Sequence, residues 1–448
     1  MSNRKIPFTL TLVLAALVAT ATISPPAQAS DPNTVLFLNG VTLNAIRFDQ
    51  TVPPVAARNL AIVHTSIYDA VNSITRMYQP YFVNLTADKN TSLEAAAASA
   101  GYTALASLYP NQSFEALKTY TFAGIPDGVA KTNGIALGQN VANQILAWRA
   151  GDGWNATYNY IPGTQPGDWQ PTPPQYAPFL VPQWGDVTPF TMSSQSLQAQ
   201  ARSSPPPALT STGYTTAFNQ VKDLGAKNST SRTVDQTEIA LFWEDCLGTY
   251  TPPGHWNAIA GVVAEAQHYD LVQDARLFAL LNLGLADAGI ACWDMKRYCS
   301  LWRPVTAIRA ADTDGNPNTV ADPDWEPLLN TPAFPSYASG HSAFSGTAAE
   351  LLTLIFGDNV PFSSDSEFMP GVERDFLNFW EAAEEAGDSR IYGGIHYEFD
   401  NLAGLLAGKD LGDYVFANFL QPVPIPTSLL LFGSGLLGLA AWGWHRKA

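Results

Sequence analysis

Apolar side chains recur at three- and four-residue spacing along most of the chain, whereas the strict alternation typical of β-strands is scarce. That spacing gathers the apolar residues on one face of an α-helix. The pattern therefore predicts an all-α fold in which the helices pack as bundles. We expect helices over 55–76, 92–108, 131–149, 209–222, 235–248, 255–269, 273–302, 342–357, 371–386 and 398–419.

A segment dense in proline, tryptophan and glycine interrupts this helical pattern at residues 151–207. An irregular stretch of this length in a compact protein usually has a function or covers other elements. The sequence thus predicts an N-terminal helical region at 30–150, a covering segment at 151–207 and a second helical domain at 208–421.

Both ends of the chain carry targeting features. Residues 1–29 contain two cations, an apolar stretch and a final Ala-Gln-Ala, as secretory signal peptides do. Residues 422–448 contain three prolines, an apolar run over 427–444 and terminal cations, and they resemble PEP-CTERM sorting tails of Gram-negative bacteria. That resemblance implies an exosortase-type processing enzyme as a partner. We expect an exported protein in the periplasm, on the cell surface or outside the cell; a permanent membrane anchor at 427–444 is the alternative.

The overall charge excludes one class of partner. The chain has 39 acidic residues against 23 lysines and arginines, a formal net charge of -16. A nucleic-acid partner requires a basic face, so we expect no nucleic acid to bind. Any cationic site must be local and formed by a few side chains.

Two cations lie in strongly apolar company near Pro304. Lys296 and Arg303 are seven residues apart in the helical pattern that ends there, and two turns would place both on one helix face, about 10 Å apart. Their neighbours include two tryptophans, and cations among apolar groups need a counter-charge. The pair indicates an anion site, with a solvated basic face as the alternative.

The tripeptide Ser339-Gly340-His341 directly precedes the helix expected over 342–357. The free backbone N–H groups and the dipole of a helix N-terminus favour an oxyanion. Gly340 allows close approach to the backbone, and His341 adds a group able to donate or accept a proton. Simple helix capping by Ser339 is the alternative explanation.

A third cation and a second histidine follow near the end of the chain. Arg390 and His396 flank a pair of glycines, and Asp400 comes four residues after His396. If a helix begins there, Asp400 can hydrogen-bond the His396 ring and fix its tautomer. The remaining histidines lack clustered partners and are predicted to be structural, although His255 could line the pocket.

Together these segments read Lys-x6-Arg-Pro, Ser-Gly-His and Ser-Arg-x5-His. This signature resembles that of the superfamily of vanadium-dependent haloperoxidases and type 2 phosphatidic acid phosphatases. The segments beginning at Val55 and Thr251 also look like its bacterial haloperoxidase branch. The resemblance implies an all-α fold with a vanadate or phosphate site inside the C-terminal bundle, within 208–421.

The resemblance also implies roles for individual residues. Vanadate, or phosphate in the same place, would be held by Lys296, Arg303, Ser339, Gly340, Arg390 and His396. His396 would be the axial vanadium ligand or, in a phosphatase, the nucleophile that forms a phosphohistidine. His341 would transfer protons, Lys296 would polarise bound peroxide, and Asp400 would support His396.

Two aromatic positions favour a haloperoxidase over a phosphatase. Trp293 and Phe334 match the positions that surround the halide in the fungal chloroperoxidase branch, and an apolar, polarisable wall strips water from a halide. We therefore expect a vanadium-dependent haloperoxidase that oxidises halide with hydrogen peroxide to hypohalous acid. The alternatives are an acid phosphatase acting on a phosphomonoester and a non-catalytic envelope or matrix protein.

Overall fold

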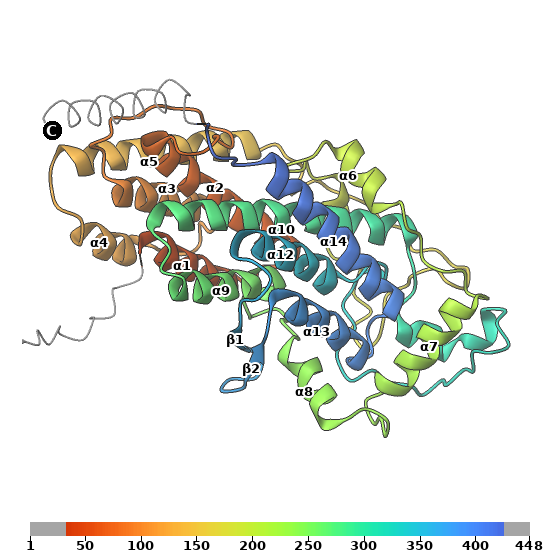
Figure 1. Ribbon diagram of the computed structural model, residues 1–448. Coiled ribbons are helices and arrows are strands. Elements are labelled where there is room, and N and C mark those ends of the chain that lie inside the picture. Colours follow the sequence, from red (N-terminus) through yellow and green to blue (C-terminus); the bar gives the residue numbers. More distant parts are fainter. Residues whose placement is uncertain (1–32, 425–448) are drawn as a thin grey trace, which may run out of the picture.

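The computed structural model describes residues 33–424, and within them it contains fourteen α-helices and one two-stranded sheet (Figure 1). The prediction of an all-α fold is confirmed. The expected signal peptide and nearly all of the expected sorting tail lie outside the described residues.

Five helices form the N-terminal part, which gathers at one end of the molecule (Figure 1). The second of them, Pro53–Thr75, is buried on almost every side and packs against the third, the fifth and a long later helix. Its small and branched apolar residues pack into the core, and the helix also buries polar residues such as Arg58, His64 and Asp69. The five helices are α1 (Thr34–Asp49), α2 (Pro53–Thr75), α3 (Leu93–Leu108), α4 (Glu115–Ala123) and α5 (Val129–Arg149).

The proline- and tryptophan-rich segment is mostly irregular, with one 3-10 turn, η1 (Pro182–Asp186), and one short helix, α6 (Ser194–Ala201). Buried carboxylates fasten it to the helix α10 (Leu271–Cys299). Asp287 accepts hydrogen bonds from the backbone amides of Phe190 and Thr191 at 2.6 and 2.8 Å. Asp294 accepts hydrogen bonds from Nε and Nη2 of Arg202 at 2.7 and 2.6 Å. The segment therefore lies across α10 as a fixed layer.

The helix α10 is the axis of the second half and runs along much of the molecule (Figure 1). It is the one described helix long and apolar enough to cross a membrane, and 94% of its most apolar window is buried inside the protein. It begins with a capping box at Asp270 and ends at the left-handed Ser300. The other elements of this half are α7 (Thr212–Leu224), α8 (Val234–Phe242), α9 (Thr251–Ala266), α11 (Pro304–Arg309), η2 (Ala311–Thr313), α12 (Gly340–Phe356), β1 (Phe362–Asp365), β2 (Glu373–Phe376), α13 (Phe379–Tyr392) and α14 (Glu398–Asn418).

Glycines at four-residue spacing let α14 approach α12 closely. A Cβ added at Gly404 would lie 2.8 Å from the carbonyl oxygen of Ser339, and one at Gly408 would lie 2.5 Å from that of Ala343. Such distances leave no room for a side chain. This contact brings the start of α14 against the N-terminus of α12, where the predicted site residues lie.

Several local predictions were wrong. Helices α1, α4, α6 and α11 were not expected. The helix expected over 371–386 is divided, because β2 pairs antiparallel with β1 and α13 starts only after the cap at Asn378. The helix expected over 235–248 ends at Phe242. For β2, pairing with β1 overrides the helical pattern of the local sequence.

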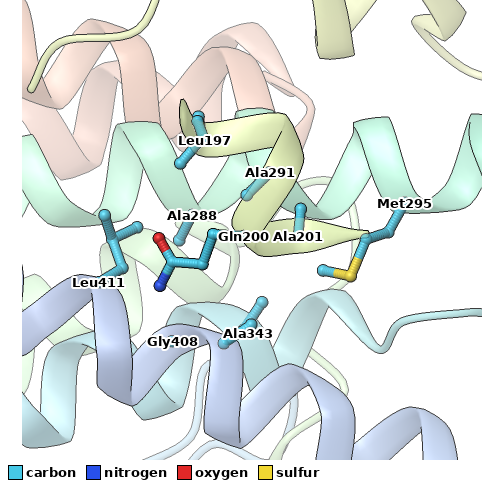
Figure 2. Close-up of a pocket in the computed structure, with 10 residues that line it drawn as sticks. Leu197, Gln200, Ala201, Ala288, Ala291, Met295, Ala343, Gly408 and Leu411 are labelled. Carbon is cyan, nitrogen blue, oxygen red and sulfur yellow. The ribbon is translucent and has the colours of Figure 1, made fainter. Parts of the chain in front are cut away.

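A small apolar pocket lies between α6, α10, α12 and α14 (Figure 2). Alanines and a glycine form much of its wall, with Leu197, Met295 and Leu411 at its sides and Gln200 as its one polar side chain. None of the predicted site residues lines it, so the candidate active site is a separate feature.

Candidate active site

The two cations near Pro304 converge, but not as predicted from a shared helix face. The helix α10 ends at Cys299, and Ser300 has a φ of 46°. The chain therefore turns, and Arg303 becomes the residue preceding α11. The expected separation along one axis was wrong, because a left-handed residue breaks the helix between Lys296 and Arg303.

The ammonium group of Lys296 is fully buried and is held by backbone carbonyls alone. It donates to the carbonyl oxygens of Pro335, Ser336 and Ala338 at 3.0, 3.1 and 2.5 Å. Burial lowers the pKa of Lys296 to about 8. The loop before α12 thus fixes this cation without neutralising it.

The two arginines are held in the same way. Arg303 donates to the carbonyls of Phe334 and Ile395 at 2.8 and 2.6 Å, while its Nη2 is buried without a partner. Arg390 donates to the carbonyl of Ala240 at 3.1 Å and to the hydroxyl of Ser389. Burial lowers the pKa of Arg303 to about 9 and that of Arg390 to about 10. Within residues 33–424, neither arginine forms a salt bridge.

Three buried cations without a bonded carboxylate make a strongly positive centre. Removing an ammonium or guanidinium group from water costs several kcal/mol unless an opposite charge compensates. The nearby carboxylate of Asp400 bonds to a histidine instead of to a cation. The centre therefore favours an anion from outside the chain.

The N-terminus of α12 also points to an anion. Ser339 is the N-cap, and its hydroxyl accepts from the amide of Ser342 at 3.3 Å. Gly340 is the first helical residue, and an added Cβ there would meet only the Trp293 ring, at 3.7 Å. Capping and anion binding are thus compatible, since the first-turn amides remain available as donors.

His396 is bonded on one side to Asp400 and faces Arg303 on the other. Its Nδ1 lies 2.8 Å from Oδ2 of Asp400, which also accepts from the hydroxyl of Ser336 and the amide of Tyr397. Its Nε2 lies 3.0 Å from Nη1 of Arg303. Burial and the neighbouring Arg303 hold the pKa of His396 well below its usual range. Nε2 thus presents a lone pair beside the cations.

Ser336 is a site residue that the sequence analysis missed. Its hydroxyl donates to Asp400 at 2.5 Å and its carbonyl accepts from Lys296. Its position three residues before Ser339 was the available signal, but a serine in a loop has no helical spacing to distinguish it.

His341 is the one predicted site residue that is not fully buried. Its Nε2 is nevertheless enclosed and has no hydrogen-bond partner. Burial and the charge of Arg390 lower the pKa of His341 well below its usual range, while the backbone carbonyls of Trp243 and Glu244 oppose that shift. The ring is therefore neutral near pH 7 and has a free nitrogen.

The two predicted halide-pocket residues form an aromatic wall over the cations. The ring centroids of Trp293 and Phe334 are 5.0 Å apart. The Nζ of Lys296 lies 4.8 Å from the Phe334 centroid and 5.8 Å from that of Trp293. The wall limits water around Lys296, which strengthens its attraction for anions.

The donor set fits an oxyanion that also takes a nitrogen ligand. Arg303 Nη2 and His341 Nε2 are buried polar atoms without partners. A bound oxyanion would accept a hydrogen bond from Arg303 Nη2, and a protonated oxygen of that anion would donate one to the unprotonated His341 Nε2. His396 Nε2 is the available nitrogen ligand. Vanadate has oxygens that accept these hydrogen bonds and a metal that takes a nitrogen ligand, whereas phosphate has only the oxygens.

Fold and site together define an all-helical protein with a buried cationic centre that suits an oxyanion. Known proteins narrow this class. Residues 276–423 match the family model of the second helical-bundle domain of vanadium chloroperoxidase. The vanadium chloroperoxidase of Curvularia inaequalis is 28% identical over 495 positions, which cover 83% of this chain and 79% of that protein.

Solved structures agree with this match. The first bacterial vanadium-dependent iodoperoxidase to be solved superposes with a TM-score of 0.76 and 31% identity, covering 88% of this chain and 97% of that one. A bacterial vanadium-dependent chloroperoxidase in its holo form gives a TM-score of 0.66 at 16% identity, covering 88% of this chain and 98% of that one. The chain belongs to the vanadium-dependent haloperoxidase family.

Proposed function

We propose that the protein is a vanadium-dependent haloperoxidase that oxidises iodide with hydrogen peroxide to hypoiodous acid. One observation carries the proposal: Lys296, Arg303 and Arg390 are buried around His396 without a bonded carboxylate. An enclosed positive centre beside an unprotonated imidazole nitrogen is what vanadate requires. Nε2 of His396 lies 3.0 Å from Nη1 of Arg303 and would exchange this contact for the metal.

In this proposal the chain holds vanadate through groups already in place. Lys296, Arg303 and Arg390 neutralise its oxygens, and Ser339 and the amide of Gly340 donate further hydrogen bonds. Nε2 of His396 is the single protein ligand of the metal. Bound vanadate supplies a Lewis acid that activates hydrogen peroxide toward attack by halide.

His341 is suited to accept a proton during this reaction. Its lowered pKa keeps the imidazole neutral near pH 7, and its free Nε2 can take a proton from incoming hydrogen peroxide. It is also the one predicted site residue that is half-buried and not buried, which supports a role nearest to the incoming substrate. The charge of Lys296 would polarise bound peroxide, and a direct hydrogen bond would replace one of its three carbonyl contacts.

Iodide is the proposed halide for two reasons. It is the most polarisable and least strongly hydrated of the three common oxidisable halides, so the wall of Trp293 and Phe334 removes its water at least cost. The chain is also 31% identical to the bacterial iodoperoxidase over 97% of that chain, against 28% for the chloroperoxidase of Curvularia inaequalis.

The test is a pair of assays on one preparation of purified protein. With orthovanadate and peroxide, we expect oxidation of iodide, weaker oxidation of bromide, and loss of both in His396→Ala. The exposed His268 provides the control variant, His268→Asn, which should remain active. Aryl phosphate hydrolysis that vanadate only inhibits would replace this proposal with an acid phosphatase. Inactivity in both assays would favour an envelope or matrix protein.

We also propose that the protein is exported and loses both ends, on the basis of the signal-like 1–29 and the sorting-like 422–448. Mass spectrometry of the protein from its native source should give a chain that begins near residue 30 and ends before the apolar run. A chain that retains 427–444 and partitions into membranes would instead indicate a permanent anchor.

A further inference from the structure

The covering segment pairs with the short stretch of chain that leads from α10 into the candidate active site. The amide of Trp169 donates to the carbonyl of Ser300 at 2.7 Å. The amide of Trp302 donates to the carbonyl of Gly167 at 2.8 Å. These two bonds form an antiparallel bridge. Residues 300–302 are thus bound by a segment that contains none of the predicted site residues.

The same stretch is bound to the loop before α12 on its other side. The bonds to the covering segment come from the residues on either side of Leu301, so its own carbonyl points away from that segment. This carbonyl accepts from the amide of Ser336 at 2.9 Å. Ser336 in turn bonds Asp400 through its hydroxyl and Lys296 through its carbonyl. The stretch therefore lies between the covering segment and the site loop, and Arg303 is the residue that follows it.

Ser300 is the strained point of this arrangement. Its φ of 46° is left-handed, a conformation that non-glycine residues seldom adopt and that persists only where the surroundings hold it. All three of its polar groups have partners. Its amide donates to the carbonyl of Lys296 at 3.0 Å, and its carbonyl accepts from Trp169. Its hydroxyl lies 2.5 Å from the hydroxyl of Tyr160. Two of the three partners belong to the covering segment.

The two residues that hold Ser300 are themselves packed together. The rings of Tyr160 and Trp169 meet edge to face at a centroid distance of 5.8 Å. Both also contact Phe179, at 4.9 and 5.7 Å. The side chains of Trp169 and Phe179 are buried. Three packed rings fix their own backbone, so the covering segment can resist rotation of Ser300 out of the left-handed region.

We propose that Tyr160 and Trp169 are positioning residues, which hold Ser300 in its left-handed conformation and thereby keep Arg303 in the candidate active site. A right-handed Ser300 would continue the turn of α10 and carry the following residues away from the loop before α12. The link to vanadate rests on the proposed function, whereas the hold on Ser300 is a property of the free protein.

The primary test measures hydrogen exchange at the Trp302 amide of the free protein. This amide donates to the covering segment, so its exchange rate reports how often the pairing opens. Leu301–Trp302 is the one Leu-Trp pair in the sequence, so nuclear magnetic resonance with carbonyl-13C leucine and 15N tryptophan selects it. We expect Tyr160→Phe to accelerate exchange about 2- to 10-fold, the usual effect of one hydrogen bond. Unchanged exchange would overturn the proposal, whether or not the protein is a peroxidase.

Two substitutions at Ser300 test the role of its conformation. Ser300→Ala and Ser300→Gly both lose the bond to Tyr160, but glycine adopts a left-handed conformation without strain and alanine does not. Ser300→Ala should therefore accelerate exchange as Tyr160→Phe does, whereas Ser300→Gly should stay close to the unmodified protein. Equal rates in the two variants would mean that the hydroxyl bond acts on its own and would refute positioning through the left-handed turn.

Tyr158→Phe is the matched control. Tyr158 lies two residues before Tyr160, is 41% exposed, and its ring contacts Arg297. Its variant makes the same chemical change in the same segment but leaves the bond to Ser300 in place. Exchange at the Trp302 amide should stay unchanged. A comparable acceleration would indicate general loosening of the covering segment and would contradict a specific action of Tyr160.

Calorimetric titration with orthovanadate gives the second reading. For Tyr160→Phe and Ser300→Ala we expect the Kd to rise about 2- to 10-fold, because Arg303 is held less well. Ser300→Gly and Tyr158→Phe should bind vanadate as the unmodified protein does. An equal loss of affinity in Ser300→Gly and Ser300→Ala would refute the link to Arg303. If the unmodified protein binds no vanadate, the proposed function fails, and the exchange rates still decide the hold on Ser300.

Discussion

Nδ1 of His396 lies 2.8 Å from Oδ2 of Asp400, and both side chains are buried. This pair fixes the proton on Nδ1, because a carboxylate accepts it there, and leaves Nε2 as a ligand. Burial raises the pKa of Asp400 to about 6, while its hydrogen bond from Ser336 opposes that change. The carboxylate is therefore ionised near pH 7 and makes the imidazole a stronger donor.

Removing this carboxylate should weaken vanadate binding. For Asp400→Ala we expect the Kd for orthovanadate to rise about 10- to 100-fold, because His396 loses both its orientation and part of its basicity. This Kd can be measured by titrating the activity with orthovanadate and by calorimetric titration of orthovanadate into the free protein. Asp413→Ala, on the exposed side of the same helix, is the control. An unchanged Kd in Asp400→Ala would show that His396 does not depend on this pair.

The affinity for vanadate should fall as the pH rises through about 8, the pKa of Lys296 in the free protein. Below this pH Lys296 is charged before and after binding. Above it the free protein must first take up a proton, because a bound anion favours the ammonium form, and affinity drops by up to about tenfold per pH unit. The ionisation of vanadate itself also contributes, so Lys296→Met is measured in parallel. Parallel pH profiles for the two proteins would exclude Lys296 as the titrating group.

The substitution Arg390→Met should weaken vanadate binding without lowering the stability of the free protein. Arg390 is buried without a bonded carboxylate, and replacing such a cation by an apolar side chain of similar length often leaves stability unchanged or raises it. We expect the free variant to melt at the same temperature as the unmodified protein or higher. Saturating vanadate should stabilise the unmodified protein by about 3 kcal/mol at 100 times its Kd, and this gain should disappear in the variant. Calorimetric melting with and without vanadate tests both statements.

Contacts at helix N-termini could be predicted from the sequence. Asp400 was expected to bond His396 if a helix begins there, and Ser339 was expected at a helix N-terminus because an apolar helical pattern follows it. Both geometries are present, with His396 just before the first residue of α14. Such contacts need only the place where a helix begins, which the sequence pattern indicates.

Contacts made through the backbone could not be predicted in this way. Lys296 is held by three carbonyls of the loop before α12, and carbonyls carry no residue-specific signal. Arg303 reaches the site only because Ser300 adopts a left-handed conformation that non-glycine residues seldom take. Asp245 meets His255 across a turn of irregular backbone. These features depend on how distant segments pack, and one sequence does not show that packing.

The close contact between α14 and α12 leads to a paired prediction. A Cβ at Gly404 would lie 2.7 Å from the Cβ of Ser342 and 2.8 Å from the carbonyl oxygen of Ser339, so Gly404→Ala must push the helices apart. We expect a loss of about 1 to 3 kcal/mol of stability, the usual cost of overpacking a core.

The same substitution at Gly40 should have the opposite effect. Gly40 lies within α1, and nothing stands within 4 Å of an added Cβ, so Gly40→Ala should stabilise by about 0.5 to 1 kcal/mol through helix propensity alone. Denaturant unfolding measures both variants. Gly404→Ala should also weaken vanadate binding, because the displaced residues include Ser339 at the N-terminus of α12, whereas Gly40→Ala should leave the Kd unchanged. Unaltered vanadate affinity in a destabilised Gly404→Ala would mean that the site tolerates movement of α14, and the glycine contact would then serve packing alone.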